Sequence, residues 1–412
     1  MTDAATNPPF VAIACGGTGG HLFPGIAVAE ELKKRGCKIA LLISPKDVDQ
    51  QAVKSAQGFE IFTLSAVGLQ NRNYFSFGLS FWKSFCASRK IFKQRKPDAV
   101  LAMGGFTSAP PILAVKKFAS KTFLHESNTI SGRANRFLAR FVDEAFIGFP
   151  ETESRLRAKK ISVTGTPVRP QFSQVCSSGR ESAQNSGNQS GLTSAATIEN
   201  CRTALGLDPN LPTILIVGGS QGASGLNEMI LSALPLLADK KWQWLHLTGA
   251  NDFEKVKAAY AAKSLKAIVK PFLAEMDLAL GAATACVSRS GASSLAEIAA
   301  MRLPSLLVPF PAAADNHQYF NALAFDKTGA AKLLEQKNAT SEEVAAILTE
   351  LVENDLARSE IQNALAQWHA PRAAEQIAEN ILSAIARQQE EIAARKSSCG
   401  CGHAHGSAKH AP

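Results

Sequence analysis

The chain has 412 residues, of which 46% are hydrophobic, and a formal net charge of +9. This length predicts two domains, and no segment approaches the roughly 20 uninterrupted apolar residues of a membrane span. The N-terminus lacks the basic and apolar regions of a secretory signal, so we expect none. The eight cysteines are scattered, which favours reduced thiols over a disulfide framework.

The first predicted unit is a strand, a glycine-rich loop and a helix. The apolar run at residues 10–14 precedes Cys-Gly-Gly-Thr-Gly-Gly-His at 15–21, and the helical pattern after it closes at Gly36. Glycines let backbone N–H groups approach an anion, so a phosphate or diphosphate ligand is the first hypothesis. The dinucleotide spacing is absent because Leu22 stands where its third glycine belongs. His21 adds an imidazole at the loop tip.

Residues 74–96, from Tyr74 to Lys96, combine aromatic and basic side chains. No acidic residue lies between Glu60 and Asp98. This composition fits a helix on an anionic membrane surface, and it equally fits an amphipathic helix packed on a sheet with a solvated basic face. No recognition motif supports nucleic-acid binding.

Apolar runs alternate with helical patterns along both halves of the chain. The predicted strands are 10–15, 38–43, 60–64, 99–103, 122–124, 145–147 and 161–163, then 213–217, 242–247, 267–270, 285–287 and 305–308. Such alternation predicts an α/β protein with two doubly wound, Rossmann-like domains, whose ligands bind at the carboxyl ends of the strands. The predicted domains are residues 8–170 and 204–395, the latter including the terminal helices.

Two segments are expected to lie outside these domains. Residues 171–203 are rich in Ser, Gly and Asn and predict a flexible insertion or linker. Residues 396–412 carry Cys399, Cys401, His403 and His405, and predict a disordered tail with adventitious affinity for a soft metal rather than a functional site.

The second half contains two further strand-to-helix junctions. Gly-Gly-Ser-Gln-Gly-Ala at 218–223 can offer its N–H groups and the Ser220 hydroxyl to a phosphate. At the third junction Glu297 follows a small-residue loop, where a carboxylate can accept hydrogen bonds from both ribose hydroxyls. The three loops together predict a nucleotide-diphosphate ligand in an interdomain cleft.

At this point the chain resembles a known family. The motifs are Gly16-Gly17-Thr18-Gly19-Gly20-His21, Met103-Gly104-Gly105, His125-Glu126-x-Asn128, Gly165-x-Pro167-Val168-Arg169, Gly218-Gly219-Ser220-Gln221-Gly222, Arg289-Ser290-Gly291-Ala292, Glu297-Ile298 and His317-Gln318-x-x-Asn321. In order and spacing they are similar to those of the MurG family of bacterial glycosyltransferases. That family adds N-acetylglucosamine from UDP-GlcNAc to undecaprenyl-pyrophosphoryl-MurNAc-pentapeptide (lipid I), forming lipid II in peptidoglycan synthesis.

The resemblance implies a two-domain B-type fold and an inverting transfer without a cofactor. It implies a donor site in the second domain and places acceptor binding and membrane association in the first. By position, the residues implied to bind substrate are Thr18, Gly19, Gly20, Asn128, Arg169, Ser220, Leu273, Ala292, Ser293, Ser294, Leu295, Ala296, Glu297 and Gln318. Among them Leu273 would read the uracil edge through its backbone, and Glu297 would bind the ribose. The family also implies peripheral attachment to the cytoplasmic face of the cell membrane through residues 74–96.

His21 is the candidate catalytic residue, because an imidazole suits a general base near neutral pH. The alternative is a hydrogen bond that fixes the loop. We assign no metal-binding motif to the site and expect the reaction to need no metal. Two other functions stay open at this stage: another UDP-sugar-dependent lipid glycosyltransferase, and a non-catalytic UDP-sugar sensor.

Overall fold

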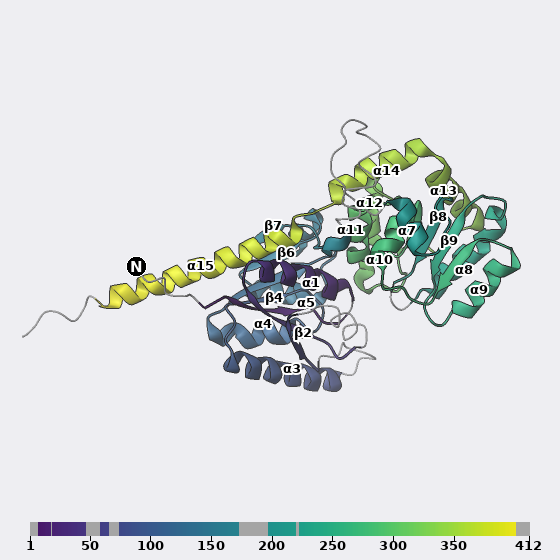
Figure 1. Ribbon diagram of the computed structural model, residues 1–412. Coiled ribbons are helices and arrows are strands. Elements are labelled where there is room, and N and C mark those ends of the chain that lie inside the picture. The colour runs from purple at the N-terminus through teal and green to yellow at the C-terminus, as the bar shows by residue number, and fades with distance from the viewer. Residues whose placement is uncertain are drawn as a thin grey trace, which may run out of the picture.

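Two parallel β-sheets, each covered by helices, form the two halves of the protein (Figure 1). The computed structural model describes residues 7–17, 19–46, 58–65, 74–172, 197–219 and 222–400. The first sheet has the strand order β3-β2-β1-β4-β5-β6-β7 and the second has β10-β9-β8-β11-β12-β13. In both, the chain starts in the centre, winds to one edge and then crosses to the other side, as the alternating pattern predicts.

The N-terminal domain contains the first sheet and the helices around it. Its elements are β1 (Phe10–Ala14), α1 (Gly19–Lys34), β2 (Lys38–Ile43), β3 (Glu60–Thr63), α3 (Tyr74–Gln94), β4 (Ala99–Ala102), α4 (Ala109–Val115), β5 (Lys121–Glu126), α5 (Arg133–Leu138), β6 (Glu144–Ile147) and β7 (Ile161–Val163).

The C-terminal domain contains the second sheet. Its elements are α7 (Ile198–Ala204), β8 (Thr213–Val217), α8 (Ser224–Ala233), β9 (Gln243–Leu247), α9 (Phe253–Ala262), β10 (Ala267–Lys270), α10 (Met276–Ala282), β11 (Ala285–Ser288), α11 (Ala292–Ala300), β12 (Ser305–Leu307), α12 (His317–Lys327), β13 (Lys332–Leu333), α13 (Ser341–Glu353) and α14 (Asp355–Trp368). The last described helix is α15 (Ala373–Gly400).

All twelve predicted strands are confirmed, with ends shifted by at most two residues. The inner strands β1, β4 and β11 are buried throughout because helices cover both faces of each sheet, so they read as continuous apolar runs. The edge strands β3, β7 and β10 are partly exposed. The sequence analysis missed β13, which has only two residues and therefore no detectable period.

The last helix corrects the predicted domain boundary. We expected the terminal helices to belong to the C-terminal domain, but α15 crosses back and lies along the N-terminal domain (Figure 1). Its apolar residues Ile377, Ala378 and Ile381 are buried in the same cluster as Val11 and Leu32. An amphipathic pattern predicts that a helix buries one face, but it does not identify the surface that covers that face.

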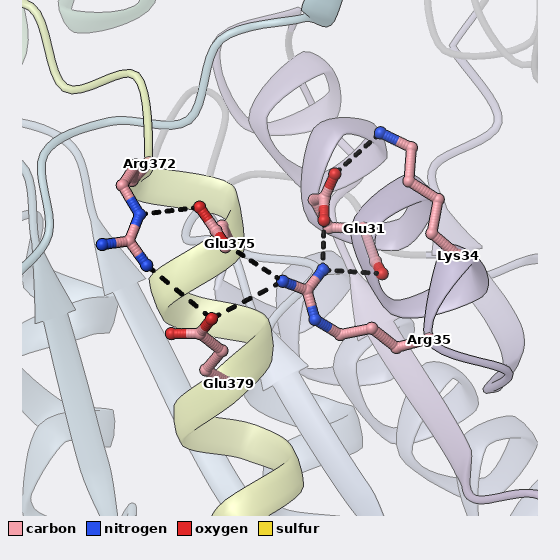
Figure 2. A network of polar contacts seen from close by, with 6 residues as sticks. All are labelled: Glu31, Lys34, Arg35, Arg372, Glu375 and Glu379. Carbon is pink, nitrogen blue, oxygen red and sulfur yellow. Dashed lines mark hydrogen bonds and ion pairs between the residues drawn. The ribbon is translucent and has the colours of Figure 1, made fainter.

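Charged residues flank this contact between α1 and α15 (Figure 2). Arg35, just beyond the end of α1, lies 3.6 Å from carboxylate oxygens of both Glu375 and Glu379 and also pairs with Glu31. Arg372 donates to Glu375 over 2.8 Å. These ion pairs surround the buried apolar stripe and are partly solvated.

Two boundaries of the predicted flexible segments are also wrong. Residues 198–203 of the predicted linker form most of α7, whose N-cap Thr197 accepts a hydrogen bond from the backbone N–H of Asn200 at 3.2 Å. Residues 396–400 of the predicted tail continue α15. Residues 171–172 at the start of the predicted linker are helical, and Phe172 is fully buried. The remaining parts of these expectations, at 173–196 and 401–412, lie outside the described residues.

Helix α3 is packed on one face and open on the other. Ser84, Ser88 and Phe92 are buried, whereas Phe75, Leu79 and Trp82 are 85%, 49% and 61% exposed. The packed-helix interpretation is therefore confirmed for one face only. Across the helices that the structure describes, none has both the length and the apolar character to cross a membrane.

Candidate functional site

The first glycine loop closely approaches the neighbouring strand end. A Cβ atom on Gly16 would lie 2.2 Å from the backbone nitrogen of Ser44, so only glycine fits there. The Gly17 carbonyl accepts a hydrogen bond from Lys46 at 2.8 Å. Helix α1 then begins at Gly19 and Gly20, which places the helix N-terminus at the carboxyl end of β1, as predicted. Thr18 lies outside the described residues.

His21 lies against a second pair of glycines. A Cβ on Gly104 would be 2.9 Å from Cε1 of the imidazole, and one on Gly105 would be 3.2 Å from Cδ2. Both glycines have positive φ, at 107° and 74°, so this turn combines a left-handed backbone with room for the ring. His21 is thus held between its own loop and the loop after β4, and its catalytic role stays a prediction.

Glu126 organises the loop after β5. Its buried carboxylate accepts hydrogen bonds from the backbone N–H of Asn128 at 2.9 Å and of Gly132 at 3.0 Å. It also accepts from the side-chain amides of Asn128 at 3.1 Å and Asn135 at 2.8 Å. Asn128 is therefore held in one orientation, with both its backbone and its amide tied to the same carboxylate.

The adjacent His125 is a structural residue. Its Nε2 lies 3.1 Å from the Gly165 carbonyl and its Nδ1 lies 3.2 Å from the Ser127 hydroxyl. Burial lowers the pKa of His125 to about 4, so the ring is neutral at physiological pH. The carbonyl can only accept, so Nε2 carries the proton and Nδ1 accepts from Ser127.

Asn321 of α12 connects the two domains at this loop. Its Oδ1 accepts from both the backbone N–H and the hydroxyl of Thr129 at 2.9 Å. Its Nδ2 donates to Oδ1 of Asn128 at 3.0 Å and to the carbonyl of Ser290 at 3.1 Å. The fully buried side-chain amide of Asn321 thus makes four hydrogen bonds. Since one of them holds the side chain of Asn128, the position of Asn128 depends on the C-terminal domain.

A second interdomain contact joins Arg169 and Glu297. The guanidinium Nη2 lies 3.6 Å from Oε1 of Glu297, and the two side chains are 16% and 15% exposed. The guanidinium also stacks 4.2 Å from the ring centre of Phe23 on α1. Burial raises the pKa of Glu297 to about 7, although the charge of Arg169 opposes the shift.

Helix α11 meets the start of α1 beside this pair. The hydroxyl of Ser293 donates to the carbonyl of Gly20 at 2.9 Å. Ala292 and Leu295 are buried in the C-terminal core, whereas Ser293, Ser294 and Ala296 are partly exposed. Ser293 therefore contacts the N-terminal domain, while Ala292 and Leu295 anchor the helix in the C-terminal core.

Two other predicted residues lie in the C-terminal domain, Gln318 in the first turn of α12 and Leu273 after β10. Oε1 of Gln318 accepts from the backbone N–H of Phe310 at 2.9 Å, and its carbonyl accepts from Ser290 at 2.8 Å. The Leu273 side chain is buried after β10, while neighbouring Phe272 is 60% exposed. Ser220 lies outside the described residues.

The structure therefore brings five of the predicted site residues into contacts between the two domains. Gly20 meets Ser293, Arg169 meets Glu297, and Asn128 meets Asn321, which in turn contacts the loop that binds Gln318. The candidate site residues omitted Glu126 and Asn321, although both stand in the quoted motifs. Glu126 could have been found from the sequence, because it is a carboxyl residue two positions before the motif residue Asn128.

Domain comparisons agree with this architecture. Residues 11–147 match the glycosyltransferase family 28 N-terminal domain, and residues 213–377 match the glycosyltransferase family 28 C-terminal domain. The crystal structure of Acinetobacter baumannii MurG aligns with a TM-score of 0.70 at 27% identity, over 91% of this chain and 100% of that one. A UDP-GlcNAc 2-epimerase from Neisseria meningitidis shares the fold, with a TM-score of 0.65 at 16% identity over 91% of this chain and 100% of that chain. The fold and site define a two-domain α/β glycosyltransferase of the B type.

Comparison with curated relatives identifies the family. A protein of Anaeromyxobacter sp. (strain Fw109-5) is 34% identical over 91% of this chain and 93% of its own length, and one of Listeria monocytogenes is 31% identical over 90% and 99%. Both are named UDP-N-acetylglucosamine–N-acetylmuramyl-(pentapeptide) pyrophosphoryl-undecaprenol N-acetylglucosamine transferase. The chain belongs to this MurG family of glycosyltransferases.

Proposed function

We propose that this protein transfers N-acetylglucosamine from UDP-GlcNAc to undecaprenyl-pyrophosphoryl-MurNAc-pentapeptide, with inversion at the anomeric carbon. The observation that carries the proposal is the convergence of motif residues from both domains on one contact, through Ser293–Gly20, Arg169–Glu297 and Asn321–Asn128. A transferase that joins a nucleotide sugar to a second substrate needs its donor and acceptor residues to meet in this way.

The donor is assigned to the C-terminal domain. Glu297 would accept hydrogen bonds from the ribose hydroxyls, which requires that the carboxylate release Arg169 or share it. The backbone at Leu273 would contact the uracil, and Gln318 and Asn128 would contact the GlcNAc hydroxyls. Glu126 supports this role because it fixes both the backbone and the amide of Asn128.

His21 is assigned as the general base. The acceptor hydroxyl attacks the anomeric carbon, its proton passes to the imidazole, and the bond from that carbon to the diphosphate oxygen breaks with its electron pair leaving on UDP. The packing of His21 against Gly104 and Gly105 supports the role because it limits where the ring can turn. The N-termini of α1 and α11 lie beside the contact and would stabilise the charge that develops on the diphosphate.

Turnover with two substrates tests the function. We expect the protein to release UDP from UDP-GlcNAc only when a soluble lipid I analogue is present, and to form the disaccharide product. Turnover with a different lipid acceptor and none with the analogue would identify another lipid glycosyltransferase. Tight UDP-GlcNAc binding without turnover on any acceptor would support a sensor instead.

We also propose that α3 attaches the protein to the cytoplasmic face of the cell membrane. Phe75, Leu79 and Trp82 follow one another at intervals of four and three residues and form one exposed apolar stripe, with exposed Lys83 and Lys90 beside it. Aromatic groups that enter the headgroup boundary act together with cations that attract anionic lipid. The opposite face of α3, with Ser84 and Ser88, is the one buried against the protein, so the exposed stripe takes no part in core packing.

Vesicle sedimentation tests this attachment. Changing Phe75 and Trp82 to Ser should weaken binding at any salt concentration, whereas changing Lys83 and Lys90 to Gln should weaken it mainly at low salt and with anionic lipid. Leu356→Ser removes a 78% exposed side chain from α14 and serves as the matched control. Unchanged sedimentation of both α3 variants would contradict the proposal.

A further inference from the structure

A buried chain of hydrogen bonds lies behind the second glycine loop, in a part of the C-terminal domain that the proposed mechanism does not use. His246 on β9 is fully buried, and Asn227 and Tyr260 are each 2% exposed. Nε2 of His246 lies 3.0 Å from Oδ1 of Asn227, and Nδ1 lies 3.2 Å from the hydroxyl of Tyr260.

The direction of every bond in this chain is determined. Nδ2 of Asn227 donates to the carbonyl of Thr248 at 3.0 Å and to Oδ2 of Asp252 at 2.8 Å, both of which only accept. Oδ1 of Asn227 therefore faces His246, whose Nε2 must donate to it. Nδ1 then accepts from the Tyr260 hydroxyl. Burial lowers the pKa of His246 to about 3, which keeps the ring neutral and this arrangement intact.

The chain ends at the glycine loop itself. Gly222 has a φ of +74°, and a Cβ there would lie 2.7 Å from the Thr248 carbonyl oxygen and 2.8 Å from Cα of Gly249. The loop thus lies directly on the carbonyl that Asn227 binds. Asn227 also stands in the first turn of α8, where its backbone N–H bonds to the carbonyl of Ala223 at 2.9 Å. Asn227 therefore connects the first turn of α8, on which it stands, to the Thr248 carbonyl, on which Gly222 lies.

We propose that His246 is a positioning residue for the junction between Gly222 and α8, acting through Asn227 and the Thr248 carbonyl so that the N-terminus of α8 is held ready for the nucleotide phosphates. This inference rests on the proposed function, because it takes this junction to bind the diphosphate of UDP. His246 contacts no substrate. Its effect is to fix the side chain of Asn227, which connects the first turn of α8 to the Thr248 carbonyl beside Gly222.

The test compares ligands with and without phosphates. Calorimetry should show that His246→Leu weakens UDP binding about tenfold, the scale of one lost hydrogen bond to a positioned group, and leaves uridine binding unchanged. His246→Gln places an amide near the position of Nε2, so it should restore donation to Asn227 and return the UDP affinity to within about twofold of the parent. Tyr260→Phe is the matched control, since it removes the hydroxyl but not the bond to Asn227.

The outcomes separate this inference from the function on which it rests. Equal loss of uridine and UDP affinity in His246→Leu, or no loss of either, would overturn the positioning role. The same UDP loss in Tyr260→Phe as in His246→Leu would also overturn it, because it would show a general effect of the buried core. A parent protein that binds no UDP would instead overturn the proposed function.

Discussion

Helix α1 contacts the rest of the protein at both ends, and the two contacts differ in kind. At its N-terminal end the Gly20 carbonyl meets Ser293, His21 packs on two glycines, and Phe23 lies under Arg169. At its C-terminal end six charged residues from α1, the turn after it and α15 form a network of ion pairs (Figure 2). The first contact joins the two domains, while the second holds the terminal helix to the first domain.

The difference shows that the density of charged contacts does not locate the function. Solvated ion pairs contribute little because the charges lose hydration and side-chain freedom when they pair. At the N-terminal end there are fewer polar groups, but the backbone of glycine-rich turns and helix starts positions each one. Substitutions at the N-terminal end of α1 and its partners should therefore have larger effects than substitutions at the C-terminal end.

Removal of the imidazole at the N-terminal end should have the largest effect. His21→Ala should lower kcat by about 10²–10⁴-fold, the usual contribution of a general base, and leave UDP-GlcNAc affinity nearly unchanged. Steady-state kinetics with a soluble acceptor measures the first quantity and calorimetry the second. Lys34→Ala, at the other end of the same helix, is the control. A His21 variant that keeps most of its kcat would leave the residue only a role in loop structure.

Glu297 should determine nucleotide affinity. Glu297→Ala should weaken UDP binding about 10- to 100-fold, because hydrogen bonds to a charged group contribute about 1.5–3 kcal/mol. Titration calorimetry provides the measurement, with Glu228→Ala on the exposed face of α8 as the control. Unchanged affinity in a folded Glu297→Ala variant would show that the ribose binds elsewhere.

The pH dependence of donor binding should follow the same carboxyl. Its pKa is raised to about 7 from the ordinary 4.5, so a growing fraction is protonated as pH falls below 7. Ribose hydroxyls donate to the ionised form, so UDP-GlcNAc affinity should rise up to about tenfold between roughly pH 6 and pH 8. Glu297→Gln should remove the slope, and a slope that persists in that variant would assign the titration to another group.

The raised pKa also makes the stability of the ligand-free protein depend on pH. A carboxyl with a raised pKa contributes to stability below its unfolded pKa and loses that contribution as pH rises through the folded value. Because of Glu297, the free energy of unfolding of the ligand-free protein should therefore fall as pH rises from about 4.5 to about 7. Thermal unfolding of the parent and of Glu297→Gln across this range should converge at the acid end.

The smallest effect is expected at the C-terminal end of α1. Arg35→Ala removes the contacts to Glu31, Glu375 and Glu379, yet it should lower the melting temperature by at most a few degrees and leave kcat unchanged. The buried stripe of Ile377 and Ile381 should keep α15 in place. A large loss of stability would show that the ion pairs, and not the apolar stripe, hold the helix.

Much of the architecture could be predicted from the sequence because it depends on local patterns. Continuous apolar runs identify buried parallel strands, and glycines mark the turns where strands lead into helices. Gly36, with a φ of +82°, ends the first helix region where the sequence places its end. The predicted position of Glu297 within a helix is also confirmed, because it too depends on a local pattern of residues.

The sequence by itself therefore determined the two sheets, their glycine-rich junctions and the identity of the residues at them. Only the tertiary structure decided that α15 packs on the first domain, that Arg169 faces Glu297, and that one asparagine amide binds residues 192 positions away. The physical reason is that periodicity reports which face of an element is buried, whereas the partner of that face depends on how two separately formed sheets come together.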